Sequence, residues 1–250
     1  MFSIIKKRYD MHSAISEGNI EKIKKAFDAG CTSTRYDMMV VAGSHTPSVI
    51  HFLREYTRCP WDESACSYAA LNKKLENLKF LHESGCPWDE NTTSSASAAG
   101  CIDCLMYAHQ NVCPWNSETS SLTVIYNVKK HITTLIKSLK TPDWMNEHYV
   151  EPIWSQEDID NIINECETHN QNLLICLSYL HKNGCPWDEN TICEAIFNDN
   201  IKCLKYAYEN SCPMPTKQQL LKLITSCDAD VQETHIENES LAFIKEKLNF

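Results

Sequence analysis

The chain has 250 residues, enough for one large domain or two ordinary ones, and its 43% hydrophobic content is sufficient for a core. Acidic residues outnumber basic residues by 33 to 23, giving a formal net charge of -10. Binding to phosphate requires clustered Lys and Arg, so we predict that nucleic acid is not a partner. Every apolar stretch is much shorter than a bilayer span, so we expect no membrane partner.

The first ten residues, MFSIIKKRYD, have neither the apolar core nor the cleavage site of a secretory signal. We therefore expect an intracellular, cytoplasmic protein. In that reducing compartment the 14 cysteines should remain thiols.

The sequence contains an internal repeat that determines the predicted architecture. Cys-Pro-Trp recurs at Cys59, Cys86, Cys113 and Cys185, and Cys-Pro recurs at Cys212, mostly at steps of 27 residues. The predicted units are 4–30, 31–58, 59–85, 86–112, 113–139, 158–184 and 185–211. A degenerate C-terminal cap at 212–250 and an insertion at 140–157 complete the chain.

Each unit has the pattern of two short helices when its Cys is counted as position 0. Small or apolar residues occupy positions 10 and 11, and apolar residues at 16, 19 and 22 form one helical stripe. Asp89 with Thr92, and Asp188 with Thr191, are candidate helix N-caps. Helices of about ten residues are marginal alone. We therefore predict one all-α domain, 1–250, a solenoid of stacked helix-turn-helix repeats of about 27 residues.

Units such as DMHSAISEGNIEKIKKAFDAGC resemble the ankyrin repeat, with its Ala-x-x-Gly turn between helices. The tandem GCPWDENT phrases resemble ankyrin-repeat proteins of giant DNA viruses, over roughly residues 4–227. The unit is about six residues shorter than the usual ankyrin repeat, and the Thr-Pro-Leu-His opening is absent. The resemblance implies an ankyrin-like fold and protein binding. A viral origin would imply that this protein binds a host protein in the host cytoplasm and acts as an adaptor or decoy.

Two residue types recur in register and predict packing between neighbouring units. The tryptophans (Trp61, Trp88, Trp115 and Trp187) are interpreted as inter-repeat packing, with a ligand-binding aromatic strip as the alternative. The position-0 cysteines are interpreted as small buried apolar residues. Equivalent positions in stacked helices lie about 8–10 Å apart, farther than the roughly 7 Å that a disulfide spans between Cα atoms.

Cys101, Cys104, His109 and Cys113 have ligand types that zinc accepts, and their spacing is close to that of a zinc knuckle. The repeat explains most of these residues, because His and Cys recur at the same positions in other units. A zinc-binding structural protein therefore remains the alternative function, while the main prediction includes no metal.

The insertion at 140–157 carries the predicted binding residues Trp144, Tyr149 and Trp154. Insertions in repeat proteins map to loops on one face, often the binding face, and aromatic residues are common interface anchors. The alternative is that these aromatics fold back over an imperfect repeat.

Catalytic signatures such as a phosphate-binding Gly-rich loop, a G-x-S-x-G elbow or H-E-x-x-H are absent from the sequence. A thiol–imidazole pair such as His181 with Cys185 is the third alternative, and it recurs in three units, which favours packing. We therefore predict a monomeric, non-enzymatic protein-interaction module without a cofactor. Its C-terminus, SLAFIKEKLNF, should form an amphipathic cap with Leu241, Ile244 and Leu248 on one face.

Overall fold

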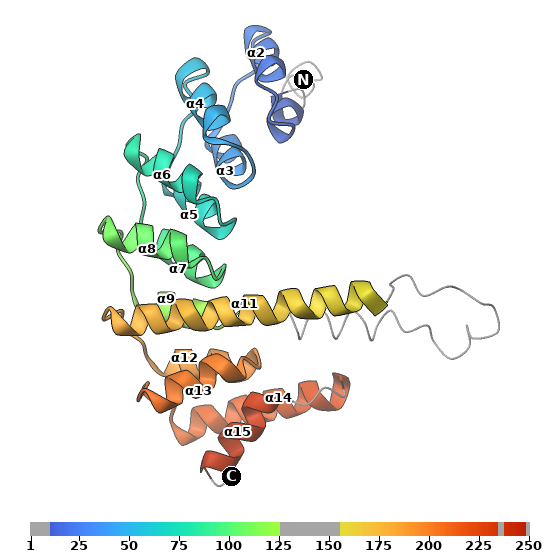
Figure 1. The fold of residues 1–250 in the computed structure, drawn as a ribbon, viewed down its shortest axis with the longest axis vertical. Coiled ribbons are helices and arrows are strands. Elements are labelled where there is room, and N and C mark those ends of the chain that lie inside the picture. The colour runs from blue at the N-terminus through green and yellow to red at the C-terminus, as the bar shows by residue number, and fades with distance from the viewer. Residues whose placement is uncertain (1–10, 126–155, 235–237, 249–250) are drawn as a thin grey trace, which may run out of the picture. The chain divides into compact units, whose positions relative to one another are not determined.

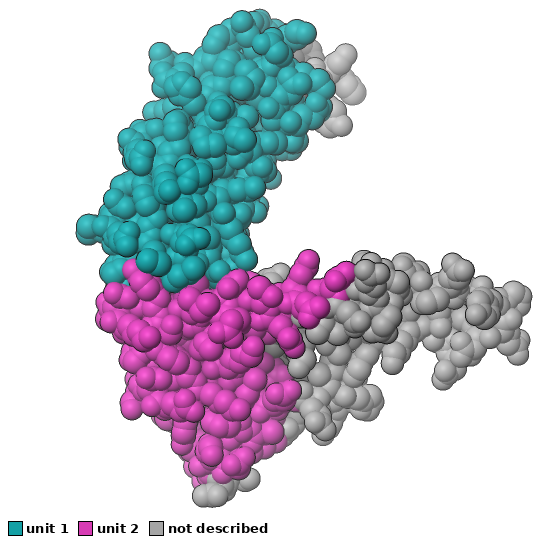
Figure 2. All heavy atoms as spheres, viewed as in Figure 1, with its two compact units in different colours: residues 1–119 teal, residues 120–250 magenta. Residues whose placement is uncertain are grey.

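The computed structural model describes residues 11–125, 156–234 and 238–248, and all regular structure within those ranges is helical. The predicted all-α helical-repeat fold is confirmed (Figure 1). The chain divides into two compact units, residues 1–119 (unit 1) and 120–250 (unit 2) (Figure 2). The proposal of a single domain remains a prediction. None of the described helices combines the length and apolar character needed to cross a bilayer.

Unit 1 is built from helical hairpins that stack in sequence order. The first helices of successive repeats pack against one another, as do the second helices, so the repeats form two layers. The first-helix layer contains α3 (Arg35–Ser44), α5 (Glu63–Leu71) and α7 (Glu90–Ala98); the second contains α2 (Ile20–Asp28), α4 (Pro47–Tyr56), α6 (Leu75–Glu83) and α8 (Ile102–Gln110). Helix α9 (Ser117–Thr123) spans the boundary between the two units.

In the repeats at 59–85, 86–112 and 185–211, the first helix begins at an aspartate that follows the tryptophan. The Asp89 carboxylate accepts a hydrogen bond from the Asn91 N–H at 3.0 Å, and Asp62 and Asp188 cap α5 and α12 (Glu189–Phe197) in the same way. These contacts satisfy backbone donors that lack helical partners. The aspartate caps are confirmed, but Thr92 and Thr191 lie inside the helices and are fully buried.

The helices of a hairpin end at residues with positive φ, which close the helix in a Schellman-type turn. At the repeat boundary, Gly85 (φ +81°) donates to His82 O and Cys86 N–H donates to Leu81 O at 2.9 Å. The same conformation recurs before each described position-0 Cys and at most turns between paired helices, as residues Gly18, Gly30, Arg58, Lys73, Gly100, Val112, Gly184, Asp199 and Ser211. Non-glycine residues therefore occupy several left-handed positions.

The core of unit 1 follows the predicted pattern. Ala69 and Ala70, the small pair of the third repeat, are fully buried, and so are Leu78 and Leu81 on the second helix. Short side chains on the first helices let neighbouring backbones approach closely. The repeat at 86–112 replaces much of this apolar surface by hydroxyl groups: Thr92, Thr93, Ser94 and Ser97 are buried, and Ser94 bonds Thr119 at 3.1 Å.

In unit 2, residues 158–184 differ from the predicted hairpin. One continuous helix, α11 (Gln156–Lys182), takes its place and includes the last two residues of the predicted insertion. Position 14, which has positive φ in most other repeats, is Asn172 within the helix. Positions 10 and 11 are Thr168 and His169 rather than a small buried pair, and Thr168 is exposed. The helix therefore lacks here the small buried pair that lets the first helices of other repeats approach one another closely.

The remainder of unit 2 contains α12, α13 (Ile201–Glu209), α14 (Lys217–Thr234) and α15 (Glu239–Leu248). Its core joins Val124, Leu173 and Leu177 to side chains of α12, α13 and α15. The predicted C-terminal cap is confirmed as α15. Leu241 and Ile244 are buried in the core, and Leu248 packs at its edge.

Candidate functional site: the repeat junctions

Four of the position-0 cysteines each connect a repeat to the one before it. Cys86 Sγ donates to the carbonyl of Asp62 at 3.4 Å, and Cys113 Sγ donates to the carbonyl of Asp89 at 3.2 Å. Cys59 and Cys212 make the equivalent contacts with Thr34 and Asp188. In each case the acceptor is the N-cap residue of the preceding first helix. The prediction that these cysteines are buried is confirmed.

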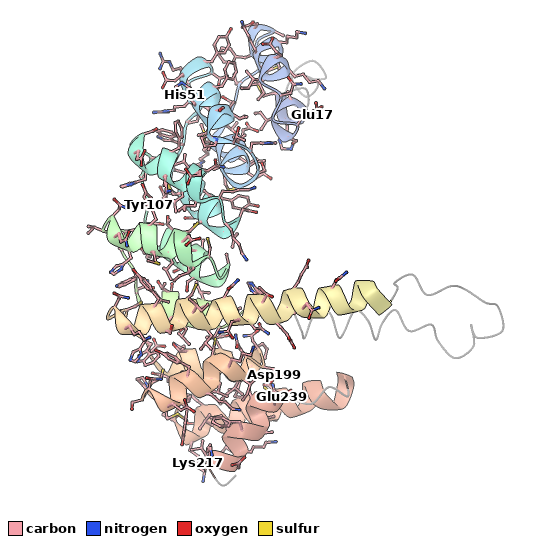
Figure 3. All side chains as sticks on the ribbon, in the orientation of Figure 1. Glu17, His51, Tyr107, Asp199, Lys217 and Glu239 are labelled. Atoms are coloured by element: carbon pink, nitrogen blue, oxygen red, sulfur yellow. The ribbon has the colours of Figure 1, made fainter. Side chains whose placement is uncertain are left out.

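The tryptophan that follows each cysteine stacks on the second helix of the preceding repeat. The Trp88 ring lies on the His82 imidazole, with ring centroids 3.8 Å apart and an interplanar angle of 11°. His82 Nδ1 also shares a hydrogen bond with the Tyr107 hydroxyl at 3.0 Å, and Tyr107 meets Trp88 edge-on. Figure 3 labels Tyr107 beside α6 and α8. Inter-repeat packing of the tryptophans is therefore confirmed.

The same cluster recurs in unit 2 with nearly identical geometry. Trp187 stacks on His181 at 4.0 Å and 15°, and His181 Nδ1 bonds the Tyr206 hydroxyl at 3.1 Å. Burial raises the pKa of Tyr206, as burial and then Glu83 raise that of Tyr107, so both phenols keep their protons at neutral pH.

Two further junctions in unit 1 use variants of this arrangement. Trp115 stacks on His109 at 4.0 Å, and the Arg54 guanidinium lies 4.2 Å from the Trp61 ring centroid as a cation–π contact. Each partner, whether His or Arg, stands at the same position near the end of a second helix. The junction chemistry is therefore constant: a planar polar group stacked on an indole.

The indoles are only half-buried, so each junction combines packing with an exposed aromatic edge. In unit 1 an exposed proline directly precedes each tryptophan in the sequence: Pro60 before Trp61, Pro87 before Trp88 and Pro114 before Trp115. We call these three tryptophans with their preceding prolines the junction strip. Sequence reasoning identified the tryptophans but missed their stacking partners. The available signal was the recurrence of His at position 23, four residues before the Cys in three of the four Cys-Pro-Trp motifs.

The binding residues predicted in the insertion, Trp144, Tyr149 and Trp154, lie outside the described residues.

The four candidate zinc ligands do not converge. His109 lies against Trp115, Cys113 points to the Asp89 carbonyl, and Cys101 and Cys104 belong to the first turn of α8. Among the residues that the structure describes, no three His, Cys, Asp or Glu side chains are grouped to hold a metal ion.

The thiol–imidazole pair is also unsupported by the geometry. His181 is engaged by Trp187 and Tyr206, while Cys185 accepts a hydrogen bond from Ser120 at 3.6 Å. Burial raises the pKa of Cys185 to about 11, which is opposite to the shift that activates a nucleophile.

Unit 1 also has an open hollow of about 430 Å³ beside α2 and α4, which sequence reasoning did not indicate. Ile20, Phe52 and Tyr56 supply its apolar surface, and His51 and Glu55 supply polar groups. Tyr56 bonds the Asp28 carboxylate at 2.9 Å. Nothing in this arrangement concentrates reactive groups.

No family model matches the sequence, and no curated protein matches it. Among solved structures, the chain is similar to the pentatricopeptide repeat protein PPR10 in complex with an 18-nucleotide psaJ RNA element, and to a cysteine-to-serine variant of that complex. Each match has 12% identity and a TM-score of 0.32, and covers 94% of this chain but only 39% of the other. The chain thus spans well under half of the PPR10 chain.

The prediction that nucleic acid is excluded as a partner is corrected by this comparison, because the two solved chains named above are bound to RNA. The net charge of -10 describes the whole chain and does not report on one local surface. At a TM-score of 0.32 the similarity does not transfer RNA binding to this chain.

Proposed function

We propose that the chain is a non-enzymatic interaction module that holds an extended segment of a protein partner on the junction strip of unit 1. The observation that supports this function is the regular recurrence of a half-exposed indole, rigidly stacked, at three successive junctions. Rigid aromatic side chains lose little conformational entropy on binding, which suits them as anchors.

The spacing of the junctions favours an extended segment over a helix. Equivalent positions on stacked helices lie about 8–10 Å apart. A polyproline II segment rises about 3.1 Å per residue with three residues per turn, so it presents the same face about every 9 Å. One residue in three could then contact successive indoles, with aromatic–proline contacts of the kind that bind Pro-rich segments.

The resemblance to viral ankyrin-repeat proteins extends this proposal to a role as adaptor or decoy for a host protein in the host cytoplasm. That extension is supported only by the repeated Cys-Pro-Trp phrases. The aromatic insertion would be a second contact in such a protein.

A peptide-display selection against the purified chain tests the proposal. We expect enriched peptides with an apolar or proline residue at every third position. Binding should weaken at least about tenfold in a Pro60→Glu, Pro87→Glu, Pro114→Glu variant, because the new charges must be desolvated beside the indoles.

The matched control introduces the same change in net charge at the turn between α5 and α6, by Asn72→Glu and Lys74→Glu, both at exposed positions. Binding should survive in that control. Equal losses in both variants, or capture of single-stranded RNA without any peptide, would contradict the proposal.

A further inference from the structure

Two cysteines lie on the first turn of α8. Cys104 stands at a position where Cys recurs in other repeats, as Cys176 and Cys203, but only this repeat also has a cysteine three residues earlier, at Cys101. Cys101 is the N-cap residue and Cys104 is the third helical residue, in a Cys-Ile-Asp-Cys sequence. Cys104 is fully buried in the core, whereas Cys101 is 8% exposed at the turn that follows Gly100. Both cysteines are therefore buried, and Cys101 is the one that keeps a small exposed fraction.

An equivalent turn in unit 2 shows where a side chain at the Cys101 position points. Asn200 has the same place in its repeat and nearly the same backbone conformation: φ −92°, ψ 73°, against φ −97°, ψ 86° for Cys101. The Asn200 side chain reaches over the first turn of α13 and accepts from Cys203 N–H at 3.3 Å. A side chain at this position therefore lies over the residue that is Cys104 in α8.

The Cys101 sulfur is also chemically distinct from the other thiols. A hydrogen bond from the Cys104 thiol, with the Cys104 backbone N–H, lowers the pKa of Cys101 to about 7 despite burial; Asp103 opposes this shift and Lys73 assists it. Burial raises the pKa of Cys113 to about 12 and that of Cys193 to about 11. Lowered pKa values are typical of Cys-x-x-Cys motifs at helix N-termini.

We propose that Cys101 and Cys104 form a reversible dithiol–disulfide site that exchanges with small-molecule disulfides such as glutathione disulfide. The Cys101 thiolate attacks one sulfur of the small disulfide, forming a mixed disulfide and releasing one thiolate. Cys104 then loses its proton and attacks Cys101 Sγ, releasing the second thiolate. The protein dithiol is oxidised by two electrons and the small disulfide is reduced to two thiols.

Limited alkylation at pH 7 tests the first step, because solvent exposure and thiolate fraction favour different cysteines as the most reactive thiol. Cys193 is the more exposed thiol, whereas Cys101 has the larger thiolate fraction. We expect iodoacetamide to modify Cys101 at least about tenfold faster than Cys193, measured by peptide mass mapping. Faster modification of Cys193 would overturn the proposal.

Glutathione disulfide tests the complete exchange. Wild-type protein should lose two hydrogen atoms and yield a peptide linked through Cys101 and Cys104. Cys104→Ala should stop at a stable glutathione adduct on Cys101. Cys101→Asn, which supplies the side chain found at the equivalent turn, should fold normally and form neither product.

A gain-of-function variant keeps the test independent of any folding defect. Asn200→Cys places a second cysteine three residues before Cys203, and we expect the altered turn to form an internal disulfide under the same conditions. A persistent glutathione adduct in the wild type, or a Cys101–Cys104 disulfide no faster than random pairing among the other thiols, would overturn the proposal.

Discussion

Residues 59–85 and 158–184 derive from the same repeat pattern, but the first folds as the α5–α6 hairpin and the second as the single helix α11. Their C-terminal ends agree closely. His82 and His181 stack on Trp88 and Trp187 respectively, with the same tyrosine geometry. The difference is confined to the turn and to the helix before it.

The turn residue alone does not explain this difference. Lys73 adopts φ +59° in the hairpin, although Asn enters the left-handed region more readily than Lys, and Asn172 stands at the equivalent position in α11. The distinction lies earlier, where buried Ala69 and Ala70 are replaced by Thr168 and His169. The hairpin forms where its first helix can be buried between neighbours, so tertiary packing selects the turn.

The largest expected effect concerns the tryptophan–histidine junction that follows each of the two regions. Trp88→Ala and Trp187→Ala should each lower the free energy of unfolding by about 3 kcal/mol, since a half-buried indole and its stacking contact are lost. Urea denaturation followed by circular dichroism measures both. A markedly smaller loss for Trp187→Ala would mean that the junction after α11 differs from the junction after α6.

Substitutions at the left-handed residue that ends the second helix should change stability by an intermediate amount. A Cβ added to Gly85 or Gly184 meets no atom within 4 Å, so only their φ values of +81° and +78° oppose alanine. Each Gly→Ala substitution should cost about 1 kcal/mol. Val112 has φ +64° at the equivalent position and is 87% exposed, so Val112→Gly should stabilise by about 1 kcal/mol.

Thermal unfolding of these three variants should therefore show two decreases and one increase in Tm. A decrease for Val112→Gly would contradict the assignment of strain to that residue.

The smallest expected effects are the changes in stability caused by glycine at positions 73 and 172, and they are distinguished by their sign. Lys73→Gly should stabilise by about 0.5 kcal/mol because Lys73 has positive φ, whereas Asn172→Gly should destabilise by about 0.4 kcal/mol because glycine is the poorer helix former. Asn172→Ala, the control, should stabilise. Stabilisation by Asn172→Gly would indicate that residues 158–184 form the hairpin after all.

Much of the fold could be predicted because the same residue pattern recurs in several units of the sequence. The small pairs such as Ala69 and Ala70, the buried cysteines and the aspartate caps all follow from positions that recur. Thr168 and His169 depart from the small pair visibly in the sequence, but that departure does not by itself predict the single continuous helix α11, because the choice between a hairpin and one helix depends on packing against neighbouring repeats.

The candidate site was predicted in part. The tryptophans were visible in the sequence, but their stacking on His82 or Arg54 joins residues of different repeats. The Cys101–Cys104 pair was first considered as part of a zinc site. Its distinct chemistry depends on the N-cap conformation of Cys101, which the residue spacing does not reveal.

The cysteine-to-carbonyl contact described above also has a consequence for how such a chain can change in length. The units at 59–85 and 86–112 each carry both halves of that contact: a Cys that donates backward and an N-cap carbonyl that accepts from the following unit. An in-frame duplication or loss of either unit would therefore leave each new neighbour with a matching half. The array can be lengthened or shortened without the invention of a new interface.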